Sequence, residues 1–489
     1  MRGYALLRLE RNTILTAERG AAPVDAAPSI LNGLAPPRRY LAAVAVSLGT
    51  ILTTMDGTIV NVALPTLARD LRTEPSTAVL IVTVYQLILM MTVLPCAALG
   101  HRYGNRSVYQ YGQAVFIVAT ILCFFARSLP FLVLVRGFQA LGAAAVLSVS
   151  SALIRSIYPL SSLGRGLALN TVIAAAAASL APTLGGAILA VASWPWLFAV
   201  IVPFALLSIL IGRKSLPETQ RQNDPYDVLG AVMCAATFGL TICGLESVVH
   251  GDSPVVSLAL VILGVGLGFF FVRRELTQSR PVLPVDLLRR KSIALPCLGT
   301  LMAYTGLMIV MVTLPFDLQQ RYHFSPVATG AVLTPLPLMT LIVAPAAGLL
   351  SDRFPAGALG AIGMVIGLAG MLCIAFLPAL PNRFDVLWRV AVCGVGYGMF
   401  FSPNSRQIIA SAPHERTAAA GALFSTIRGA GQTLGATAVA ALLALGNGVG
   451  STPPLIASVL ALIAGYCSLA VLRPSIRRPH SAENESVKD

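Results

Sequence analysis

Apolar runs of roughly twenty residues recur along most of this chain of 489 residues, and a helix of about that length crosses the hydrocarbon core of a bilayer. Hydropathy places fourteen such runs. They are separated by short polar turns and by two longer polar segments, 213–227 and 273–292. The pattern predicts an all-α membrane protein with fourteen transmembrane helices. The predicted spans are 41–62, 77–99, 108–126, 130–153, 167–192, 196–212, 228–247, 255–272, 294–316, 327–350, 358–380, 387–410, 418–446 and 454–472.

The composition excludes a water-soluble fold, because 56% of the residues are hydrophobic and only 11% are charged, against roughly 25% in an average soluble protein. A net charge of +14 raises the question of a nucleic-acid partner. The basic residues, however, fall mostly in alternate loops, without the aromatic interleaving of a nucleic-acid surface. The eight cysteines lie in or beside apolar runs without metal-ligand spacing. We therefore expect no nucleic acid, no metal and no cofactor.

The basic residues predict the topology. With the N-terminus inside, the predicted cytoplasmic segments hold 26 Lys and Arg and the external loops hold six. Positive charge is retained on the cytoplasmic side of a membrane, so both termini are expected there. Residues 1–39 lack the apolar segment of a cleavable signal peptide and are predicted to be a disordered cytoplasmic tail, as are residues 473–489. The expected location is the bacterial inner (cell) membrane.

A weak internal repeat predicts how the helices are grouped. The loop string at 97–104 resembles the string at 348–354, 251 residues further on, and both lie in tight cytoplasmic turns. This spacing favours two homologous six-helix bundles, 40–212 and 294–472, joined by a linker, 213–293, that contains two inserted transmembrane helices. Related halves around a site at the membrane midplane are the architecture of alternating-access carriers.

Asp56 lies inside the first apolar run, where a charged side chain costs about 2.5 to 3.5 kcal/mol on insertion scales. Burial disfavours the charged form of a carboxylate, so a proton-coupling or cation-binding role is the favoured interpretation. A plain hydrogen bond between helices, or a side chain that reaches the outer interface, is the alternative.

Arg136, Gln139 and Gly142 follow one another at helical spacing in the fourth run and share one face. A guanidinium keeps its charge in proteins and needs water or an anion. We expect Arg136 to promote proton release from a nearby carboxylate, with a fixed hydrogen bond to backbone carbonyls as the alternative. Arg428 and Gln432 form a similar pair in the thirteenth run.

Weaker candidates lie elsewhere in the apolar runs. Pro182, Gly185 and Gly186 follow one another in the fifth run; proline removes a backbone donor and glycine lets a neighbouring helix approach closely. These three predict a hinge between the halves, or only close packing. Glu246 and Asp317 lie near the outer ends of the seventh and ninth runs and are candidates for a membrane-buried charge.

Several of these strings together resemble a known family. Residues 55–65, Met-Asp-Gly-Thr-Ile-Val-Asn-Val-Ala-Leu-Pro, resemble the first-helix signature of the fourteen-helix drug/proton antiporter branch of the major facilitator superfamily. Arg136, Gln139 and Gly142 resemble the fourth-helix motif, and Pro182, Gly185 and Gly186 resemble the fifth-helix antiporter motif. The entry into the sixth helix and the second half also match, at Trp194, Trp196, Phe198 and Pro203 and at Leu318–Gln319 and Pro403–Asn404. The resemblance runs from about Leu41 to Leu472 and implies a major facilitator fold.

The loop between the second and third helices departs from that family. The family usually has Asp at the position of His101, and this Asp helps to lock the halves in the outward-facing state. Arg102, Gly104 and Arg106 still match, and the second copy keeps Asp352 and Arg353. We expect these six residues to gate the halves. Protonation of His101 near neutral pH is a hypothesis for a switch, and a tolerated loop substitution is the alternative. Further departures at Ala97, Ala181, Pro195 and Ile201 indicate a divergent member.

The resemblance implies a secondary active transporter that exports a small amphiphilic compound or drug in exchange for protons, by alternating access. Asp56 is the expected carboxylate that senses proton and substrate, and Arg136 is its electrostatic partner. A proton-coupled importer or exporter of a specific metabolite is the alternative. A periplasmic adaptor is left open. A membrane enzyme is not expected, because the histidines are scattered rather than clustered with acids.

Overall fold

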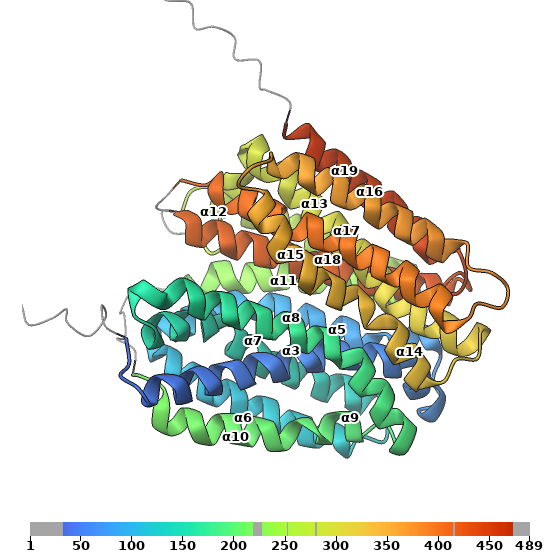
Figure 1. Cartoon of the computed structure of the whole chain (residues 1–489), viewed down its shortest axis with the longest axis horizontal. Helices are drawn as coiled ribbons and strands as arrows, with labels where there is room; N and C mark the ends of the chain where they lie inside the picture. Colours follow the sequence, from blue (N-terminus) through green and yellow to red (C-terminus); the bar gives the residue numbers. More distant parts are fainter. Residues whose placement is uncertain (1–32, 219–226, 252, 279–280, 414–415, 473–489) are drawn as a thin grey trace, which may run out of the picture.

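The computed structural model describes residues 33–218, 227–251, 253–278, 281–413 and 416–472. Within these residues all regular structure is helical (Figure 1). The elements are α3 (Arg38–Asp70), α4 (Pro75–Ala78), α5 (Leu80–Tyr103), α6 (Asn105–Phe124), α7 (Leu129–Ile157), η1 (Leu160–Ser162), α8 (Leu163–Val191), α9 (Trp196–Ala199), α10 (Ile201–Ser215), α11 (Val228–Val249), α12 (Pro254–Glu275), η2 (Val285–Arg289), α13 (Lys291–Phe316), η3 (Asp317–Arg321), α14 (Pro326–Leu333), α15 (Pro335–Leu350), α16 (Ala356–Ala375), α17 (Arg383–Ala410), α18 (Thr417–Ala444) and α19 (Thr452–Ala470).

The predicted all-α membrane fold is confirmed. Thirteen helical segments in the described part of the chain are long and apolar enough to cross a membrane. The remaining predicted span, 418–446, is the 28-residue helix α18, which carries Arg428 and Gln432. The prediction of 358–380 was too long: α16 ends at Ala375, because Pro378 and Pro381 soon follow and cannot continue a helix.

The predicted tails lie largely outside the described residues. Residues 1–32 and 473–489 are not among the described residues. The tail prediction of 1–39 extended slightly too far, since α3 begins at Arg38 and therefore includes its last two residues.

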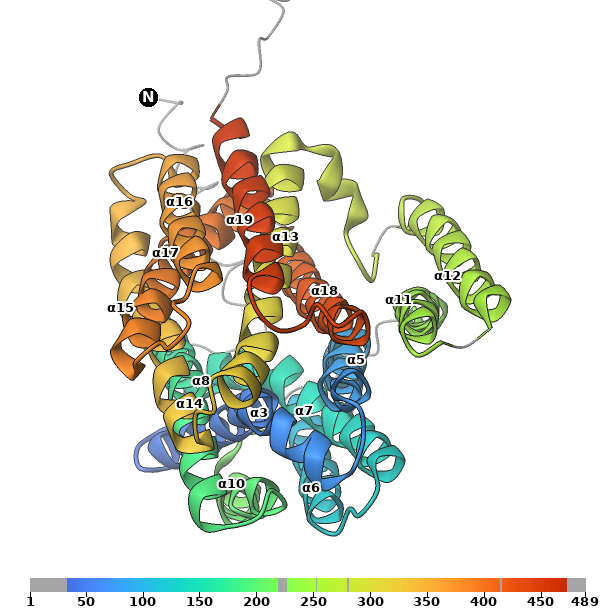
Figure 2. The same cartoon turned by 90° about the vertical axis from the view of Figure 1, so that its right-hand side faces the viewer.

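The helices form two groups, which Figure 1 shows one above the other. Helices α3 to α10 pack mainly on one another, as do α13 to α19. The inserted helices α11 and α12 pack together at one side, where α11 also contacts α5 and α18 (Figure 2). This packing agrees with two bundles and an inserted pair, while the boundaries 40–212, 213–293 and 294–472 stay predictions.

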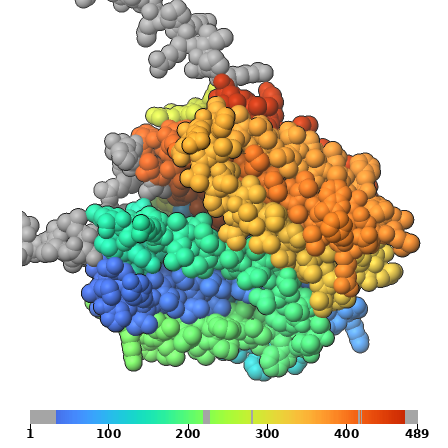
Figure 3. Space-filling view, in the orientation of Figure 1, coloured from blue at the N-terminus to red at the C-terminus, as the bar shows by residue number. Residues whose placement is uncertain are grey.

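The two ends of the bundle differ in charge and in packing. We call the end with Arg102, Arg106, Arg213, Arg273 and Arg353 the basic end. A hydrophobic core shared by the two halves lies nearer the opposite end, where α3, α13 and α18 meet. Toward the basic end the hydrophobic cores of the two halves are separate, and Figure 3 shows a hollow between α8 and the helices above it. The halves therefore close at the opposite end.

The inserted pair is fixed at the basic end by Asp227. Its carboxylate accepts a hydrogen bond of 2.9 Å from the backbone nitrogen of Gly230 and so caps α11. Arg274 of α12 donates to both carboxylate oxygens at 2.5 and 2.8 Å, and this guanidinium holds the pKa of Asp227 below its usual range. At the end of α12, the buried Glu275 accepts a bond of 2.9 Å from the backbone nitrogen of Leu283.

Replacement of Asp227 by Ala should lower the free energy of unfolding by about 1 kcal/mol at neutral pH, the usual worth of such a cap. Because the pKa of Asp227 is lowered on folding, its contribution is complete above the carboxyl pKa of the unfolded chain. It is lost as the pH falls through the lower folded value. Thermal unfolding in detergent should thus show a difference at neutral pH that shrinks in acid.

The matched control for this experiment is Glu218→Ala. Glu218 is also bound to an arginine, Arg106 at 3.4 Å, but its side chain is 90% exposed, and exposed pairs contribute little. A control as destabilised as Asp227→Ala would contradict the assignment.

Candidate functional site

A fully buried ion pair lies inside the first half, between α3 and α7. The guanidinium Nη1 of Arg136 donates to Asp56 Oδ2 at 2.7 Å. The side chains are 1% and 0% exposed, respectively. Arg136 and Asp56 are 80 residues apart in the chain, so the structure brings together the two charged residues that the sequence singled out.

Gln139 completes this pair. Its Nε2 donates to Asp56 Oδ1 at 2.9 Å and to the hydroxyl of Thr120 on α6 at 2.8 Å, while its Oε1 accepts a bond of 2.7 Å from Arg136. Both carboxylate oxygens of Asp56 are thus occupied. A proton that binds Asp56 replaces an acceptor with a donor and weakens its bond to Arg136.

Aromatic rings cover the guanidinium of Arg136. The ring of Tyr85 on α5 lies 4.1 Å from the guanidinium carbon, and that of Phe198 on α9 lies at 5.7 Å. Such contacts stabilise a desolvated cation. The Nε of Arg136 is buried without a hydrogen-bond partner among the described residues. The pair therefore keeps one donor without a partner from the described residues in a fully buried site.

Glycines allow the helices around the pair to approach closely. A Cβ on Gly142 of α7 would lie 2.6 Å from the backbone nitrogen of Phe116 and 2.7 Å from the carbonyl of Gly112, both on α6. Real Cβ atoms do not approach backbone this closely. Gly142 thus sets the spacing of α6 and α7 that lets Thr120 reach Gln139.

A cavity of about 190 Å³ lies between the two halves, next to the buried pair. It is lined by residues of α3, α5, α8, α13, α14, α15 and α18. The polar side chains in its wall are uncharged: Thr58, Asn61, Gln86, Tyr304 and Gln432. The Oδ1 of Asn61 is buried without a hydrogen-bond partner in the described structure, and this leaves an acceptor for a donor group.

Helix α3 connects the cavity to the ion pair. Asp56 points toward α7, whereas Gly57, Thr58 and Asn61 of the same helix line the cavity. Helix α5 behaves similarly, with Tyr85 over Arg136 and Gln86 in the cavity wall. A shift of α3 therefore changes both places together.

The glycines of α8 close the opposite end against the second half. A Cβ on Gly186 would lie 2.5 Å from the carbonyl of Pro326 on α14. In the same seam, a Cβ on Gly330 of α14 would collide with the carbonyl of Pro182. Gly185 packs instead on Ile59 of α3, and α8 continues as a helix through Pro182.

Two hydrogen bonds cross between the halves beside this seam. The hydroxyls of Thr183 and Thr334 bond to each other, and Gln319 Nε2 donates to the carbonyl of Val62 at 3.0 Å. Both join a first-half helix to a second-half segment, so the closed end is held by polar contacts as well as by packing.

The predicted gate residues at the basic end make their contacts within their own halves. Gly104 ends α5 with a φ of 94°, a conformation that favours glycine. Arg106 donates to the carbonyl of Arg213 at 2.6 Å, and Arg102 lies 5.5 Å from the ring of Tyr103. His101 is exposed on the surface of α5.

The second copy of this loop is similar. Asp352 pairs with Arg406 at 2.5 Å, and Arg353 is exposed. These contacts stay inside the second half, in agreement with the separation of the halves at this end.

The other candidate charges lie away from Asp56. Arg428 is exposed and interacts with the hydroxyl of Tyr304, a residue that lines the cavity. Asp317 accepts a bond of 3.1 Å from the backbone nitrogen of Gly450. Glu246 lies on α11 with His250 one turn further on.

Sequence reasoning missed Tyr85, Thr120, Asn61 and Gln86. A polar residue in an apolar run was the available signal for Asn61 and Gln86, and Asn61 lies within the first-helix signature. No such signal marks Tyr85 or Thr120, since tyrosine and threonine are common in membrane helices.

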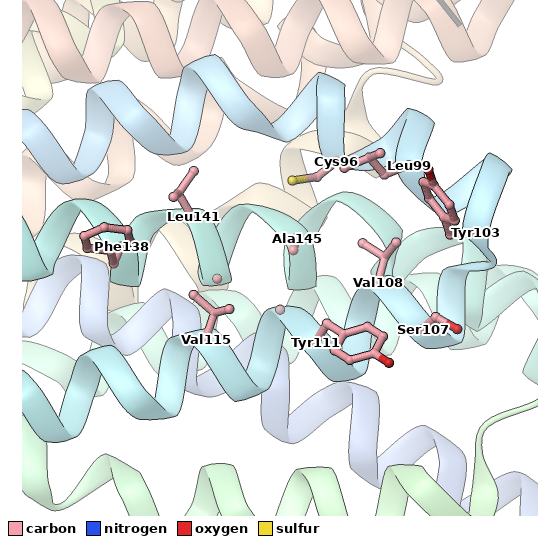
Figure 4. A pocket seen from close by; sticks show the side chains of 12 residues that line it. Cys96, Leu99, Tyr103, Ser107, Val108, Tyr111, Val115, Phe138, Leu141 and Ala145 are labelled. Carbon is pink, nitrogen blue, oxygen red and sulfur yellow. The ribbon is translucent and has the colours of Figure 1, made fainter. Parts of the chain in front are cut away.

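A larger groove of about 640 Å³ lies on the outer face of the first half (Figure 4). Leu99 and Tyr103 of α5 line one side, Tyr111 and Val115 of α6 line the other, and Phe138 of α7 lies at its floor. Its lining is almost wholly apolar, as expected of a surface that faces lipid, so it is not part of the site around Asp56.

Membrane-spanning helices in two halves, with a cavity between them, define a membrane transporter rather than an enzyme. The family model described as Major Facilitator Superfamily matches residues 46–436 and 296–488. The chain is also 40% identical over 450 residues, 91% of its length and 98% of the relative's, to the uncharacterized transporter YebQ of Escherichia coli (strain K12). The chain belongs to the Major Facilitator Superfamily.

Two other relatives are each 27% identical. They are the riboflavin transporter RibZ of Clostridioides difficile (strain 630), with 81% of this chain and 87% of the relative covered, and the multidrug efflux pump LfrA of Mycolicibacterium smegmatis (strain ATCC 700084 / mc(2)155), with 82% and 80% covered. A crystal structure of the peptide transporter POT has the same fold, with a TM-score of 0.69 at 14% identity over 88% of this chain and 93% of that one. The relatives of this chain thus include members of the drug-transporter branch of the superfamily.

Replacement of Arg136 by Gln should lower the free energy of unfolding by about 3 to 5 kcal/mol, because removal of one partner leaves Asp56 charged and unpaired in a buried site. The double variant Asp56→Asn, Arg136→Gln should recover much of this loss. Thermal unfolding in detergent of both single variants and the double variant measures the coupling. Strictly additive losses would show that the pair does not act as a unit.

Replacement of Gly330 by Ala should loosen the closed end, because its Cβ meets the carbonyl of Pro182. The readout is disulfide formation between Thr183→Cys and Thr334→Cys, in a background without the eight native cysteines. The cross-link should form readily when Gly330 is retained and slowly in the Gly330→Ala variant. Gly164→Ala is the control, since its Cβ would meet nothing within 4 Å. Equal rates in all three proteins would contradict the role of this seam.

Proposed function

We propose that this protein is a proton-coupled exporter of small, neutral amphiphilic compounds that works by alternating access. The observation that carries the proposal is the position of Asp56 beside Gly57 and Thr58 on α3, with the carboxylate in the ion pair and its neighbours in the cavity wall. Substrate and proton then act on the same helix from opposite faces.

The uncharged wall of the cavity supports a neutral substrate. A buried charge on the substrate would need a charged partner, whereas Thr58, Asn61, Gln86 and Gln432 offer hydrogen bonds only. The volume of about 190 Å³ is below the roughly 300 to 1,000 Å³ of pockets for drug-sized ligands. In this state the cavity therefore suits a small compound, or one part of a larger one.

The orientation follows from the basic end, which we place in the cytoplasm by the positive-inside rule. Both termini then lie in the cytoplasm, and the membrane is the bacterial inner membrane. The halves, closed outside and separated inside, correspond to a state that takes up substrate from the cytoplasm or the inner leaflet.

Coupling in this proposal acts through the ion pair. A proton that reaches Asp56 from outside weakens its bond to Arg136 and frees α3 from α7. As the proton leaves toward the cytoplasm, Arg136 attracts the carboxylate again and restores the pair. One proton that moves down 100 mV supplies about 2.3 kcal/mol, which supports a substrate gradient of about 50-fold.

Efflux of the neutral dye Nile red from cells or into inside-out vesicles tests the proposal. The expected result is uphill transport that a protonophore abolishes, and that Asp56→Asn reduces from about 50-fold to no gradient. Asp70→Asn is the matched control, because Asp70 is an exposed acid at the end of the same helix and should transport normally.

Different failures of this test have different meanings. Uphill transport that ignores the protonophore would refute proton coupling. Accumulation of dye in cells, driven by the proton gradient, would refute export and favour the importer. Transport of the cation ethidium in place of Nile red would refute the neutral substrate.

A further inference from the structure

The inserted helix α11 carries a buried acid that the mechanism at Asp56 does not use. The side chain of Glu246 is 10% exposed, and neither of its carboxylate oxygens has a hydrogen-bond partner within the described residues. A charged carboxylate in such a place is costly, and buried polar groups are normally satisfied. An unsatisfied acid of this kind needs an explanation.

Glu246 faces both halves of the transporter. Thr83 of α5 and Thr437 of α18 are the hydroxyl groups that lie near its carboxylate. The hydroxyl of Thr437 is itself buried and unpaired in the described part, whereas that of Thr83 bonds to the carbonyl of Val79 at 3.4 Å. A protonated carboxyl group could donate to Thr437 and satisfy both groups at once.

His250 lies one turn further along and links Glu246 to the outside. Its Nδ1 donates to the backbone carbonyl of Glu246 at 2.8 Å and lies 3.8 Å from the carboxylate Oε2. Its Nε2 is buried and has no partner among the described residues. The side chain is 21% exposed at the opposite end of the bundle, so the imidazole lies between the acid and the external water.

The surroundings contain few other titratable groups. On α11 itself, Cys243 is near enough to interact with Glu246. From α12, the contact at this end joins the hydroxyls of Ser257 and Ser247 at 3.0 Å. Among the described residues, the polar groups that α5 and α18 bring near Glu246 are the hydroxyls of Thr83 and Thr437. The ionisable partner that lies beside Glu246 is therefore His250, in contrast to Asp56, whose partner Arg136 is a permanent cation.

The same stretch of α11 joins the two halves. A small hydrophobic cluster of Leu87 and Met90 from α5 with Ile242 from α11 packs beside Leu434 of α18, and Figure 2 shows α11 against α5 and α18. A charge at Glu246 would lie directly at this junction, next to the unpaired hydroxyl of Thr437 and apolar side chains.

We propose that Glu246 and His250 form a second proton-binding site, on the inserted helix and separate from Asp56, whose protonation stabilises the contact of α11 with both halves. The ligand is a proton from the side of the opposite end. Loss of the proton leaves a charge at the junction and loosens α11 from α18. The inserted pair thereby makes the closed end sensitive to the pH on its own side.

Infrared spectroscopy of the reconstituted full-length protein tests this directly, because a protonated carboxyl group has a C=O stretch distinct from that of a carboxylate. A pH titration of the wild type should show a buried carboxylic acid band that Glu246→Gln removes. Asp56→Asn should leave that band in place. Asp317→Asn is the matched control, a buried acid near the same end that already accepts a backbone hydrogen bond.

His250→Gln gives the second measurement. The imidazole lies 3.8 Å from the carboxylate and can carry a positive charge, which favours the charged form of a neighbouring acid, so the midpoint of the Glu246 band should move to higher pH in this variant.

The proposal is overturned if Glu246→Gln removes no band, if the band belongs to Asp56, or if His250→Gln leaves the midpoint unchanged. These outcomes are independent of the efflux assay. A Glu246 band with efflux that ignores a protonophore would refute only the proposed function, and coupled efflux without the band would refute only the second site.

Discussion

The structure depends on one interaction, the buried bond between Arg136 and Asp56. A guanidinium cannot lose its proton in a protein, so a buried arginine requires a negative partner and fixes the position of that partner. Here the requirement fixes α3 against α7, while Gln139 and Thr120 extend it to α6. Because α3 also supplies the cavity wall, the charge balance of the pair and the shape of the cavity are set by one helix.

The second constraint is the glycine seam between α8 and α14. Backbone packed against backbone leaves no flexible side chain to absorb a small displacement, so this end is either closed or open. At the basic end the repeated loops around Gly104 and Asp352 bind only within their own halves. Tight contact at one end and separate contacts at the other make a rocking motion of two rigid halves the simplest change available.

Much of this was accessible from the sequence, for identifiable reasons. Charged residues in apolar runs are so costly that Asp56 and Arg136 could be expected to meet, although hydropathy alone cannot say that they do. The roles of Tyr85 and Thr120 could not be predicted, because membrane helices are apolar all round and no periodic pattern reveals which side faces a neighbouring helix. The pair of Arg428 with Gln432 shows the same limit, since a similar helical spacing gave Arg428 an exposed position beside Tyr304 rather than a buried partner.

The inserted helices take on a role that two bundles alone would lack. Asp56 lies wholly inside the first half, so in the proposed mechanism a proton on Asp56 affects the second half only through the movement of α3. Glu246 instead lies where α11 meets α5 and α18, one helix from each half. In the two proposals, the permanent cation Arg136 favours release of a proton from Asp56, whereas the charge at Glu246 follows the pH of the solution beside it. Two acids with such different partners would respond to different signals under these proposals, the first to the conformation of the protein and the second to the pH at its closed end.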